Sequence, residues 1–552
     1  MYKVVMVAGA CLLAGLAWAD VTPNDPGVVG ADDSASIQNA VDAAVKRGEK
    51  CVIPGFNSRT GTNLWVFTKC VKLPSLATVV IDNAHLRMGD GMVDNFFRSA
   101  NAYTAEGRTK AGRLTGIRIL GVGNAVLDGG RHNGLTEFTA GKDGRPTTLF
   151  NTPILLVNVR NFEVSGLTIL DHRYWGTCFN FCSYGRIAHV RFLAHGTCNN
   201  QDGINLRNGC HDILVEDITG QTNDDMIALS GIDVRDCDLE KPNPWSRDVA
   251  DDSPDIYSIT IRNVVACAAN HPFISLRNHD GVKVHDINIS RVSESDYQEP
   301  LASGANAGRY AMIRLGQALY WHKRPSQPGE TYNIVIRDIS ARVAEKAVVA
   351  NATIKNLRIS GVTCTGNCRC AFTTFGAVWS APGVKLEDAV LQNLSVVSDH
   401  PDATIAEFPL FAPDQYVRDC RLVECALEKQ GKRTVVAREA VDRAFDPNGL
   451  GKFVRFSDEK TVADHRFRVL PESEAAGAPG NYRVAIEPVI PTGETRVDGV
   501  IQTRYGPFVT HMTRDLVFVA TPCPARVTAF GKTEDTGSGV YYFCRNPPGY
   551  TW

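Results

Sequence analysis

Three aspartates and one histidine recur at a common interval in the middle of the chain. Asp224 and Asp225 follow Asp202 by 22 and 23 residues, and His271 follows Asp225 by another 46. If one structural unit has about 23 residues, the four side chains lie on one strip of stacked units, about 4.8 Å apart from one unit to the next. Carboxyl groups this close raise the pKa of one group while a neighbour stays ionised. Such a cluster suits acid/base hydrolysis of a glycosidic bond, in which one carboxylic acid protonates the leaving oxygen and the others activate a water.

Each of these residues also has a plainer interpretation. Asp202 and Gly203 form a favourable turn dipeptide, and an aspartate before an apolar strand commonly satisfies turn amides. His271, which precedes Pro272, is of a kind often found in loops. Clustered carboxylates are also the ligands that Ca²⁺ prefers. The catalytic interpretation rests on all four side chains falling on one strip, and a calcium site remains an alternative.

Short β segments set the interval of that strip. Val164 and Ile187 are 23 residues apart, Ile187 and Ile213 are 26 apart, and Ile213 and Ile259 are 46 apart. A period in the twenties indicates one structural unit per repeat, and the alternation of apolar and polar residues excludes a helical repeat. We therefore predict an all-β chain folded as a right-handed parallel β-helix, with Val and Ile inside and Asn and Gly at the corners. The segments are 116–120, 162–169, 187–192, 213–218, 259–264, 282–287, 334–339 and 354–359.

Both ends of the repeat region differ from it. A helix is predicted over 35–46, with its N-cap in 32–34 and its end at Gly48, and it would cover the open N-terminal end of the β-helix. After about residue 430 the repeats stop, a helix is expected over 433–446, and β segments punctuated by Pro and Gly follow. The predicted organisation is a signal peptide at 1–19, a catalytic β-helix domain at 20–430 and a smaller β-rich accessory region at 431–552.

Composition and the N-terminus restrict the class of protein. Lys plus Arg is 58 and Asp plus Glu is 60, a net charge of -2, which argues against a nucleic-acid binder. Lys3 precedes an apolar run over 4–18, and the tract 17–19 offers a small-x-small cleavage site. This pattern predicts a signal peptide and a secreted or periplasmic protein without a membrane span.

The sequence contains 16 cysteines, 15 of them after the signal segment. In an oxidising compartment we expect disulfides. The local candidates are Cys364 with Cys368 or Cys370, Cys420 with Cys425, and Cys523 with Cys544. A zinc site within 364–370 is the less favoured alternative.

The tracts around the aspartates resemble a known family. Residues 200–205 and 223–229, which contain the three aspartates, are similar to the Asn-Thr-Asp-Gly and Gly-Asp-Asp-Cys-Ile-Ala motifs of glycoside hydrolase family 28, the polygalacturonases and their relatives. The resemblance covers roughly residues 30–400 and is most specific between 155 and 230. It implies a β-helix and inverting, single-displacement hydrolysis. It also implies that Asp224 is the general acid and that Asp202 and Asp225 activate the water.

The chain departs from the family where the substrate carboxylate would be bound. The family's Arg-Ile-Lys aligns with residues 314–316, so Arg314 is kept while Gly316 stands in place of the lysine. Losing that lysine removes a point charge aimed at an acidic sugar, and Arg207 and Arg277 are candidate replacements. Trp175 and Trp321 are candidate aromatic residues for stacking on sugar rings.

Three functions of different classes follow. The leading one is a monomeric, secreted hydrolase of an acidic polysaccharide such as pectin, which needs no cofactor or metal. The second is a β-helix lyase or epimerase acting on uronic acids, for which Lys283, Arg314 or Tyr320 would have to be the base. The third is a non-catalytic carbohydrate-binding β-helix or adhesin.

Overall fold

The computed structural model describes residues 20–130, 151–195, 200–232, 246–268, 271–295, 311–316, 326–350, 352–374, 384–400, 403–409 and 415–444, and after residue 451 the backbone of a series of strands. The predicted signal peptide lies outside the described residues. In the described part of the chain, the strands form an 18-stranded sheet, a 13-stranded sheet and three small sheets.

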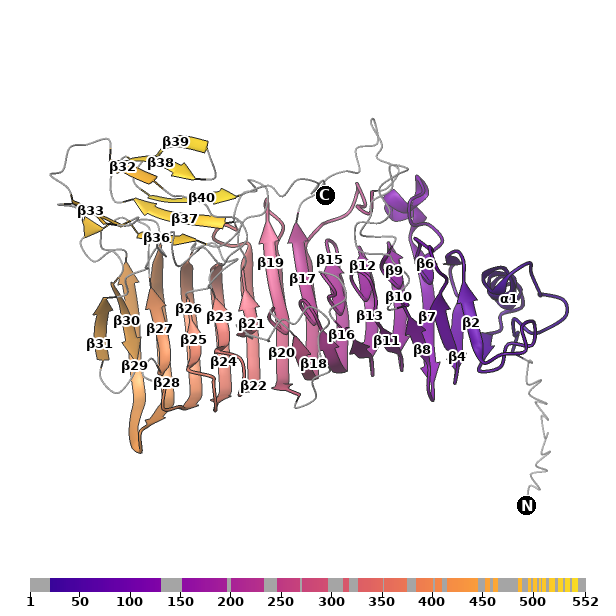
Figure 1. The fold of residues 1–552 in the computed structure, drawn as a ribbon, viewed down its shortest axis with the longest axis horizontal. Coiled ribbons are helices and arrows are strands. Elements are labelled where there is room, and N and C mark those ends of the chain that lie inside the picture. Colours follow the sequence, from indigo (N-terminus) through magenta and orange to yellow (C-terminus); the bar gives the residue numbers. More distant parts are fainter. Residues whose placement is uncertain are drawn as a thin grey trace, which may run out of the picture.

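The chain is a right-handed parallel β-helix, as predicted. Each coil contributes strands to both large sheets, and successive coils pair in parallel from β1 to β28 in one sheet and from β3 to β27 in the other. Figure 1 shows these coils stacked along the long axis of the molecule. The eight predicted β segments all fall on strands of the 18-stranded sheet or the turns beside them, which confirms the repeat.

The elements have the following bounds. The helices are α1 (Asp33–Arg47), η1 (Glu106–Arg108) and η2 (Lys110–Gly112). The 18-stranded sheet contains β1 (Cys51–Pro54), β2 (Leu64–Phe67), β4 (Thr78–Asp82), β5 (His85–Met88), β7 (Leu114–Val122), β8 (Val126–Asp128), β10 (Val159–Ser165), β11 (Thr168–Leu170), β13 (Ser183–Ala188), β14 (Arg191–Leu193), β16 (His211–Thr222), β18 (Ile256–Ala268), β20 (Val284–Glu294), β22 (Thr331–Ala341), β24 (Thr353–Cys364), β26 (Lys385–Val397), β28 (Tyr416–Lys429) and β29 (Lys432–Ala444).

The 13-stranded sheet contains β3 (Val71–Leu73), β6 (Phe97–Ser99), β9 (Ile154–Val157), β12 (Thr177–Asn180), β15 (Ile204–Arg207), β17 (Ile227–Ile232), β19 (Ile274–His279), β21 (Ala311–Leu315), β23 (Lys346–Ala350), β25 (Cys370–Thr373), β27 (Thr404–Pro409), β30 (Lys452–Phe456) and β31 (Lys460–Asp464). The small sheets contain β32 (Ala485–Pro488), β33 (Thr495–Val497), β34 (Val500–Thr503), β35 (Gly506–Pro507), β36 (Val509–Met512), β37 (Leu516–Thr521), β38 (Ala525–Ala529), β39 (Lys532–Thr536) and β40 (Gly539–Cys544).

The core consists of aliphatic side chains that stack from coil to coil. Ile213, Ile259, Ile287, Ile334 and Leu357 occupy equivalent positions of β16, β18, β20, β22 and β24, and all are buried. Because successive side chains of a strand point to opposite faces, the residues between them face away from this core. One face of the 13-stranded sheet therefore carries side chains that do not belong to the core.

Left-handed backbone conformations repeat once per coil at two corners of the 18-stranded sheet. Asn is frequent there, as predicted, but Asp is also frequent, and Gly occurs in these two columns only at positions 166 and 361. Asn and Asp tolerate this conformation better than other non-glycine residues and dominate the first column, and some of them bond along it, as Asn333 does to Asp286 at 2.8 Å. The first column is Asn161, Tyr184, Asp212, Ser258, Asp286, Asn333, Asn356, Asp388 and Asp419, and the second is Gly166, His189, Asp217, Asn263, Arg291, Asp338, Gly361, Asn393 and Glu424.

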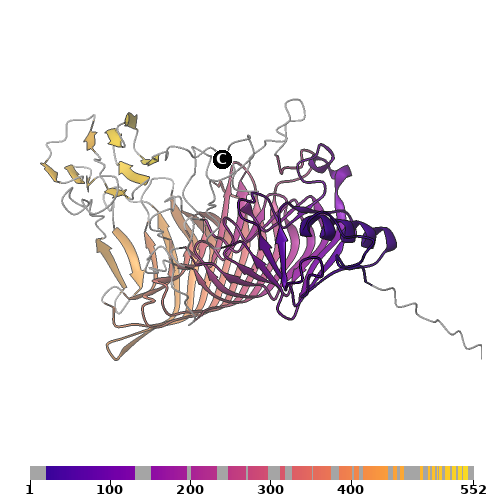
Figure 2. The same cartoon turned by 45° about the vertical axis from the view of Figure 1, so that its right-hand side comes forward.

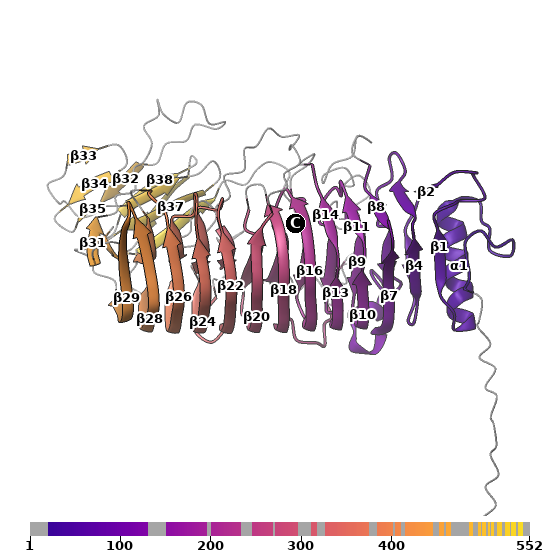
Figure 3. The same cartoon turned by 90° about the horizontal axis from the view of Figure 1, so that it is seen from below.

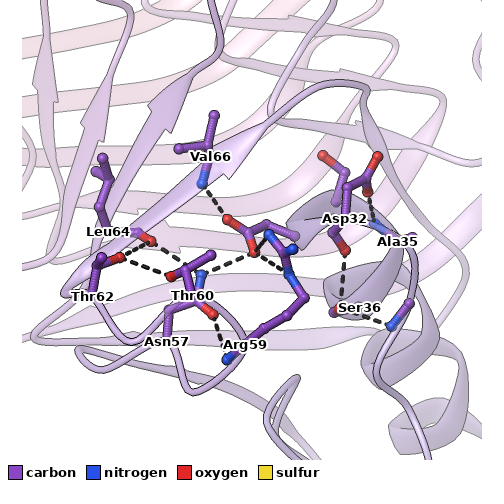
Figure 4. A network of polar contacts seen from close by, with 12 residues as sticks. Asp32, Ala35, Ser36, Asn57, Arg59, Thr60, Thr62, Leu64 and Val66 are labelled. Carbon is purple, nitrogen blue, oxygen red and sulfur yellow. Dashed lines mark hydrogen bonds and ion pairs between the residues drawn. The ribbon is translucent and has the colours of Figure 1, made fainter.

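Helix α1 covers the N-terminal end of the stack, as predicted (Figure 2). Asp32 is its N-cap and accepts a hydrogen bond from the backbone N–H of Ala35, and Gly48 ends it with a φ of 70°. Buried Asp33 joins the helix to the first coils, because its carboxylate accepts hydrogen bonds from Asn57, Arg59 and the N–H of Val66. Figure 4 shows Asn57, Arg59 and Val66 of this network, with the cap contacts of Asp32 beside them.

The region after residue 430 differs from its prediction at one point. The segment 433–446 was expected to be helical, but Lys432–Ala444 is strand β29, which pairs antiparallel with β28. Pairing with an exposed sheet edge outweighs the local helical preference of this segment. Strands β30 and β31 extend the other sheet in the same antiparallel way. Figure 3 shows β29 beside β28 at the end of the stack. The predicted accessory region at 431–552 stays a prediction.

One of the predicted cysteine pairings is incompatible with the structure. Cys420 and Cys425 lie five residues apart on β28, about 16 Å at the rise of a strand, so they cannot form a disulfide. Cys364, Cys368 and Cys370 are buried, and the thiols of Cys364 and Cys368 lie within hydrogen-bond reach of each other, so this pairing stays a prediction. The pair of Cys523 and Cys544 lies outside the residues whose side chains are described. In the described residues, no helix is long and apolar enough to cross a membrane.

Candidate active site

Four neighbouring strands of the 13-stranded sheet position the predicted site. Ile204 of β15, Ile227 of β17, Ile274 of β19 and Ile313 of β21 occupy equivalent positions in the register, and all four belong to the core. The alternate positions of these strands therefore face away from the core. They carry polar groups on adjacent coils, namely Asn205, Arg207, Ser230, Ser275, Arg277 and Arg314.

The aspartates lie where the chain enters β15 and β17. The N–H of Gly203 donates to the carbonyl of Asp225 at 2.9 Å, and the next N–H along continues the ladder, so Asp202 and Asp225 are at equivalent positions of adjacent coils. A Cβ atom at position 203 would lie 2.4 Å from the carbonyl oxygen of Met226. Glycine is therefore required beside Asp202 for the two coils to approach this closely.

Asp224 and His271 form a pair between adjacent coils, because β17 and β19 are neighbouring strands. The Oδ1 atom of Asp224 lies 2.8 Å from Nδ1 of His271, and it also accepts a hydrogen bond from the N–H of Asp225 at 2.8 Å. Burial acts to lower the pKa of His271, but the charge of Asp224, its hydrogen bond and the charge of Asp225 together raise that pKa above its ordinary value. Burial acts in the opposite sense on Asp224, and the histidine and its hydrogen bond hold the pKa of Asp224 below its ordinary value. The pair therefore carries one proton, held by the imidazole.

Two arginines hold Asp225. Its side chain is 1% exposed, Nη2 of Arg277 donates to Oδ2 at 3.2 Å, and Nη2 of Arg314 lies 3.7 Å from Oδ1. Arg314 also donates to the hydroxyl of Ser275 at 3.3 Å. Burial raises the pKa of Asp225, and the two guanidinium groups oppose that rise.

Asp202 is the carboxyl with the fewest partners. It is 2% exposed, its Oδ2 accepts a hydrogen bond from the amide of Asn205 at 3.1 Å, and its Oδ1 has no hydrogen-bond partner among the described residues. Burial and the charges of Asp224 and Asp225 raise its pKa well above the ordinary value. An unsatisfied buried carboxyl oxygen is a position at which a water or a substrate hydroxyl would bind.

The same groups could also bind a metal ion, and calcium was the alternative expected from the sequence. One ligand atom from each of Asp224, Asp225 and His271 lies within 4.8 Å of the others. Calcium prefers a shell of oxygen ligands, whereas this cluster includes an imidazole that already shares a proton with Asp224. Arg277 and Arg314 also place two positive charges beside Asp225. The donor set suits proton transfer better than it suits Ca²⁺.

No protein-family model matches the chain, and no curated protein matches it in sequence. Solved structures of similar fold include an exopolygalacturonase from Thermotoga maritima, at 13% identity with 77% of this chain and 95% of that chain covered and a TM-score of 0.47. An endo-xylogalacturonan hydrolase from Aspergillus tubingensis is 14% identical, with 74% and 91% covered and a TM-score of 0.43. A surface adhesin of Streptococcus pneumoniae is 11% identical, with 80% and 98% covered and a TM-score of 0.40. Similar structures thus include hydrolases and an adhesin, and the activity must be argued from the side chains.

Gly316 explains the missing lysine in structural terms. The N–H of Gly316 donates to the carbonyl of Leu276, on the strand that contains Arg277. The φ of Gly316 is 91°, and a Cβ at this position would lie 2.6 Å from the Cβ of Ala352. A side chain is therefore excluded there. Arg277 occupies the equivalent position one coil earlier and brings a guanidinium to Asp225. The sequence-based candidates Arg277 and Arg314 are both part of the cluster.

The remaining candidates are Arg207 and Trp175, beside the cluster on its N-terminal side, then Trp321, and the candidate lyase bases Tyr320 and Lys283. The guanidinium of Arg207 lies 5.0 Å from the ring centroid of Trp175, which stacks in turn on Tyr174 at 4.5 Å. Trp321 and Tyr320 lie outside the described residues. Lys283, a candidate lyase base, is an exposed residue of the turn between β19 and β20.

Sequence reasoning missed two residues of this surface. Asn205 could have been found, because it belongs to the tract 200–205 that contains Asp202 and directly follows the apolar Ile204, so that on a strand it would face away from the core. Arg247 carried no such signal, because it lies in the connection between β17 and β18, outside the repeat.

Proposed function

We propose that the chain is a secreted glycoside hydrolase that cleaves an acidic polysaccharide by inverting, carboxylate-based acid/base hydrolysis. The observation that carries the proposal is the Asp224–His271 pair at 2.8 Å beside the two buried carboxyls Asp202 and Asp225. One group of this cluster holds a transferable proton while another offers an unsatisfied oxygen for a water. Those are the two requirements of a single-displacement glycosidase.

The roles of the residues follow from their contacts. Asp224 delivers the proton to the leaving oxygen, and His271 supplies the proton that Asp224 passes on. Asp202 and Asp225 orient the attacking water, with Asp202 as the base once it is ionised. Arg277 and Arg314 fix Asp225 by their ion pairs, and they bring positive charge to a site for an acidic sugar. This division keeps the roles that the family resemblance implies.

The experiment is a screen of the secreted chain against acidic and neutral polysaccharides. Reducing ends and ultraviolet absorbance are recorded together, because a lyase produces an unsaturated, absorbing product and a hydrolase does not. The proposal predicts new reducing ends on an acidic polysaccharide without that absorbance, and proton NMR of the first product should show the inverted anomer. An unsaturated product would assign a lyase, and binding without any cleavage would assign a carbohydrate-binding protein.

A further inference from the structure

Two guanidinium groups lie together on the N-terminal side of the carboxyl cluster. Arg207 is on the outward face of β15, and Arg247 lies in the connection that precedes β18, with its Nη1 3.9 Å from Sγ of Cys178 on β12. Burial, together with the positive charge of Arg247, lowers the pKa of Arg207 to about 10. In the described residues, neither arginine forms an ion pair with a carboxylate.

The surroundings of these arginines are apolar and aromatic. A second group of buried side chains, separate from the main core, contains Leu155, Val157, Tyr174, Trp175 and Cys178. Leu155 and Cys178 share a row with Asn205 on the outward face of the sheet. Nε of Arg207 is buried there without a hydrogen-bond partner among the described residues. Burial acts to lower the pKa of Arg247 as well, but Cys178, Tyr103 and Asp248 raise it above its ordinary value. The charge of Arg207 is therefore the one that this surface disfavours, unless a ligand brings the opposite charge.

The arrangement has a counterpart on the other side of the carboxyls. Arg207, Ser230 and Arg277 occupy equivalent positions of β15, β17 and β19, so the two arginine positions are two coil spacings apart, about 10 Å. Arg277 is committed to Asp225, whereas Arg207 and Arg247 have no such partner in the described residues. The carboxyls therefore lie between two groups of positive charge along the helix axis.

We propose that Arg207 and Arg247 form a second anion subsite. It binds an acidic group of the sugar that lies next to the scissile bond, toward the N-terminal end of the β-helix. The inference rests on the proposed hydrolase and specifies its substrate, which carries an acidic group on both sugars that flank the bond. Paired guanidinium groups bind a carboxylate or a sulfate through charge-assisted hydrogen bonds, and the apolar floor packs against the sugar ring.

The test uses Arg207→Gln and Arg247→Gln, with Arg291→Gln as the control, because Arg291 is an exposed arginine on the 18-stranded sheet. Each variant is assayed with an acidic oligosaccharide and with its methyl ester. We expect kcat/KM for the acidic substrate to fall about 10- to 100-fold in both variants, while the value for the ester stays within about twofold. Equal losses on both substrates, or no loss on either, would overturn the subsite.

A structural role is separated by thermal unfolding. Arg207→Gln should leave the melting temperature unchanged or raise it, since the charge of Arg207 is disfavoured there and no ion pair is broken. A lowered melting temperature together with equal loss on both substrates would assign the arginines to packing. Arg247→Gln tests the same subsite if Arg207→Gln does not fold, because Arg247 lies outside the repeat.

Binding is measured separately from hydrolysis by calorimetry in an Asp224→Asn background. Carboxylated and sulfated oligosaccharides are compared there, and the tighter one identifies the acidic group. If acidic ligands bind through Arg207 and Arg247 but the parent chain cleaves nothing, the hydrolase proposal fails and the subsite stands. If cleavage occurs but the affinity is the same with and without the two arginines, the subsite fails and the hydrolase stands.

Discussion

In the mechanism we propose, the transferable proton is shared between Asp224 and His271, whose Oδ1 and Nδ1 atoms are 2.8 Å apart. Asp202 has the complementary property, because its pKa is raised and it must lose its proton to act as a base. The two groups therefore need opposite protonation states at the same pH. That requirement is met only between their two pKa values.

We predict a bell-shaped dependence of kcat/KM on pH. The acid limb should have a midpoint above the ordinary range of an aspartate, since activity rises only as Asp202 ionises. The basic limb should have a midpoint above 6.5, the ordinary value for histidine, since activity falls as the Asp224–His271 pair loses its proton. His271→Gln should move the basic limb to lower pH. A basic limb that is unchanged in this variant would remove His271 from the mechanism.

Stability should respond in opposite directions to two replacements in the cluster. The raised pKa of Asp202 means that its contribution to stability is greatest below its unfolded pKa and is lost as pH rises through the folded value. At pH 7 it destabilises the fold, so Asp202→Asn should increase the free energy of unfolding by about 1 kcal/mol. Asp225→Ala should decrease it by about 3–5 kcal/mol, because Arg277 and Arg314 lose their buried partner. Denaturant unfolding measures both changes, and equal signs would contradict the charge arrangement.

At the level of the strands, the site depends on one register across β15, β17, β19 and β21. The sequence period placed the aspartates on this strip correctly, because each coil advances the chain by one strand spacing. The 46 residues between Asp225 and His271 were expected to be two coils, but they are one coil with a long connection between β17 and β18, which places His271 level with Asp224. The contacts of Arg277 and Arg314 with Asp225 were not predictable in the same way. These contacts depend on how far each side chain extends toward the neighbouring coil. The sequence indicated the arginines only as ligands of the substrate.

Position 316 offers a test of this strand geometry. Gly316→Lys restores the lysine of the similar family, but the backbone has a φ of 91° and no room for a Cβ beside Ala352. We expect the variant to lower the free energy of unfolding by about 1–3 kcal/mol and to gain no affinity for an acidic substrate. Gly329→Lys is the matched control, since it has a similar φ of 88° but nothing within 4 Å of its Cβ. If Gly316→Lys bound acidic oligosaccharides more tightly without loss of stability, the steric account of the missing lysine would be wrong.

For the molecule as a whole, stacking of similar coils is the source of the long core, and the ends need separate protection. Helix α1 covers the first coil, and Asp33 connects it to the loop and strand that follow β1. A stack of this kind is stable only if its terminal units are capped. The N-terminal cap should therefore affect the stability of the entire β-helix.

Asp33→Ala is predicted to lower the free energy of unfolding by about 3 kcal/mol, because Arg59, Asn57 and the N–H of Val66 lose a buried acceptor. Asp42→Ala, an exposed position of the same helix, should have little effect. Chemical denaturation followed by circular dichroism compares the two. Equal effects of the two changes would show that the Asp33 network does not anchor the cap.

The sequence was sufficient for the coils, for the Asn residues at the corners and for the capping helix, since each has a local signal in period, in Asn usage or in capping residues. It was insufficient where the chain leaves the repeat. Lys432–Ala444 has a helical pattern but pairs with the last parallel strand, and the pairing of Cys420 with Cys425 could be rejected only once both lay on β28. Arg247 shows the same limit, because no period places a residue of a connection.

The central claim is that Asp202, Asp224, Asp225 and His271 act together on a glycosidic bond. Its most direct test is the turnover number of Asp224→Asn on the acidic polysaccharide that the parent chain cleaves, with binding of the same substrate measured in parallel. Our account predicts a loss of turnover of about 10²- to 10⁴-fold with the affinity largely retained. Turnover within a few-fold of the parent chain would contradict it.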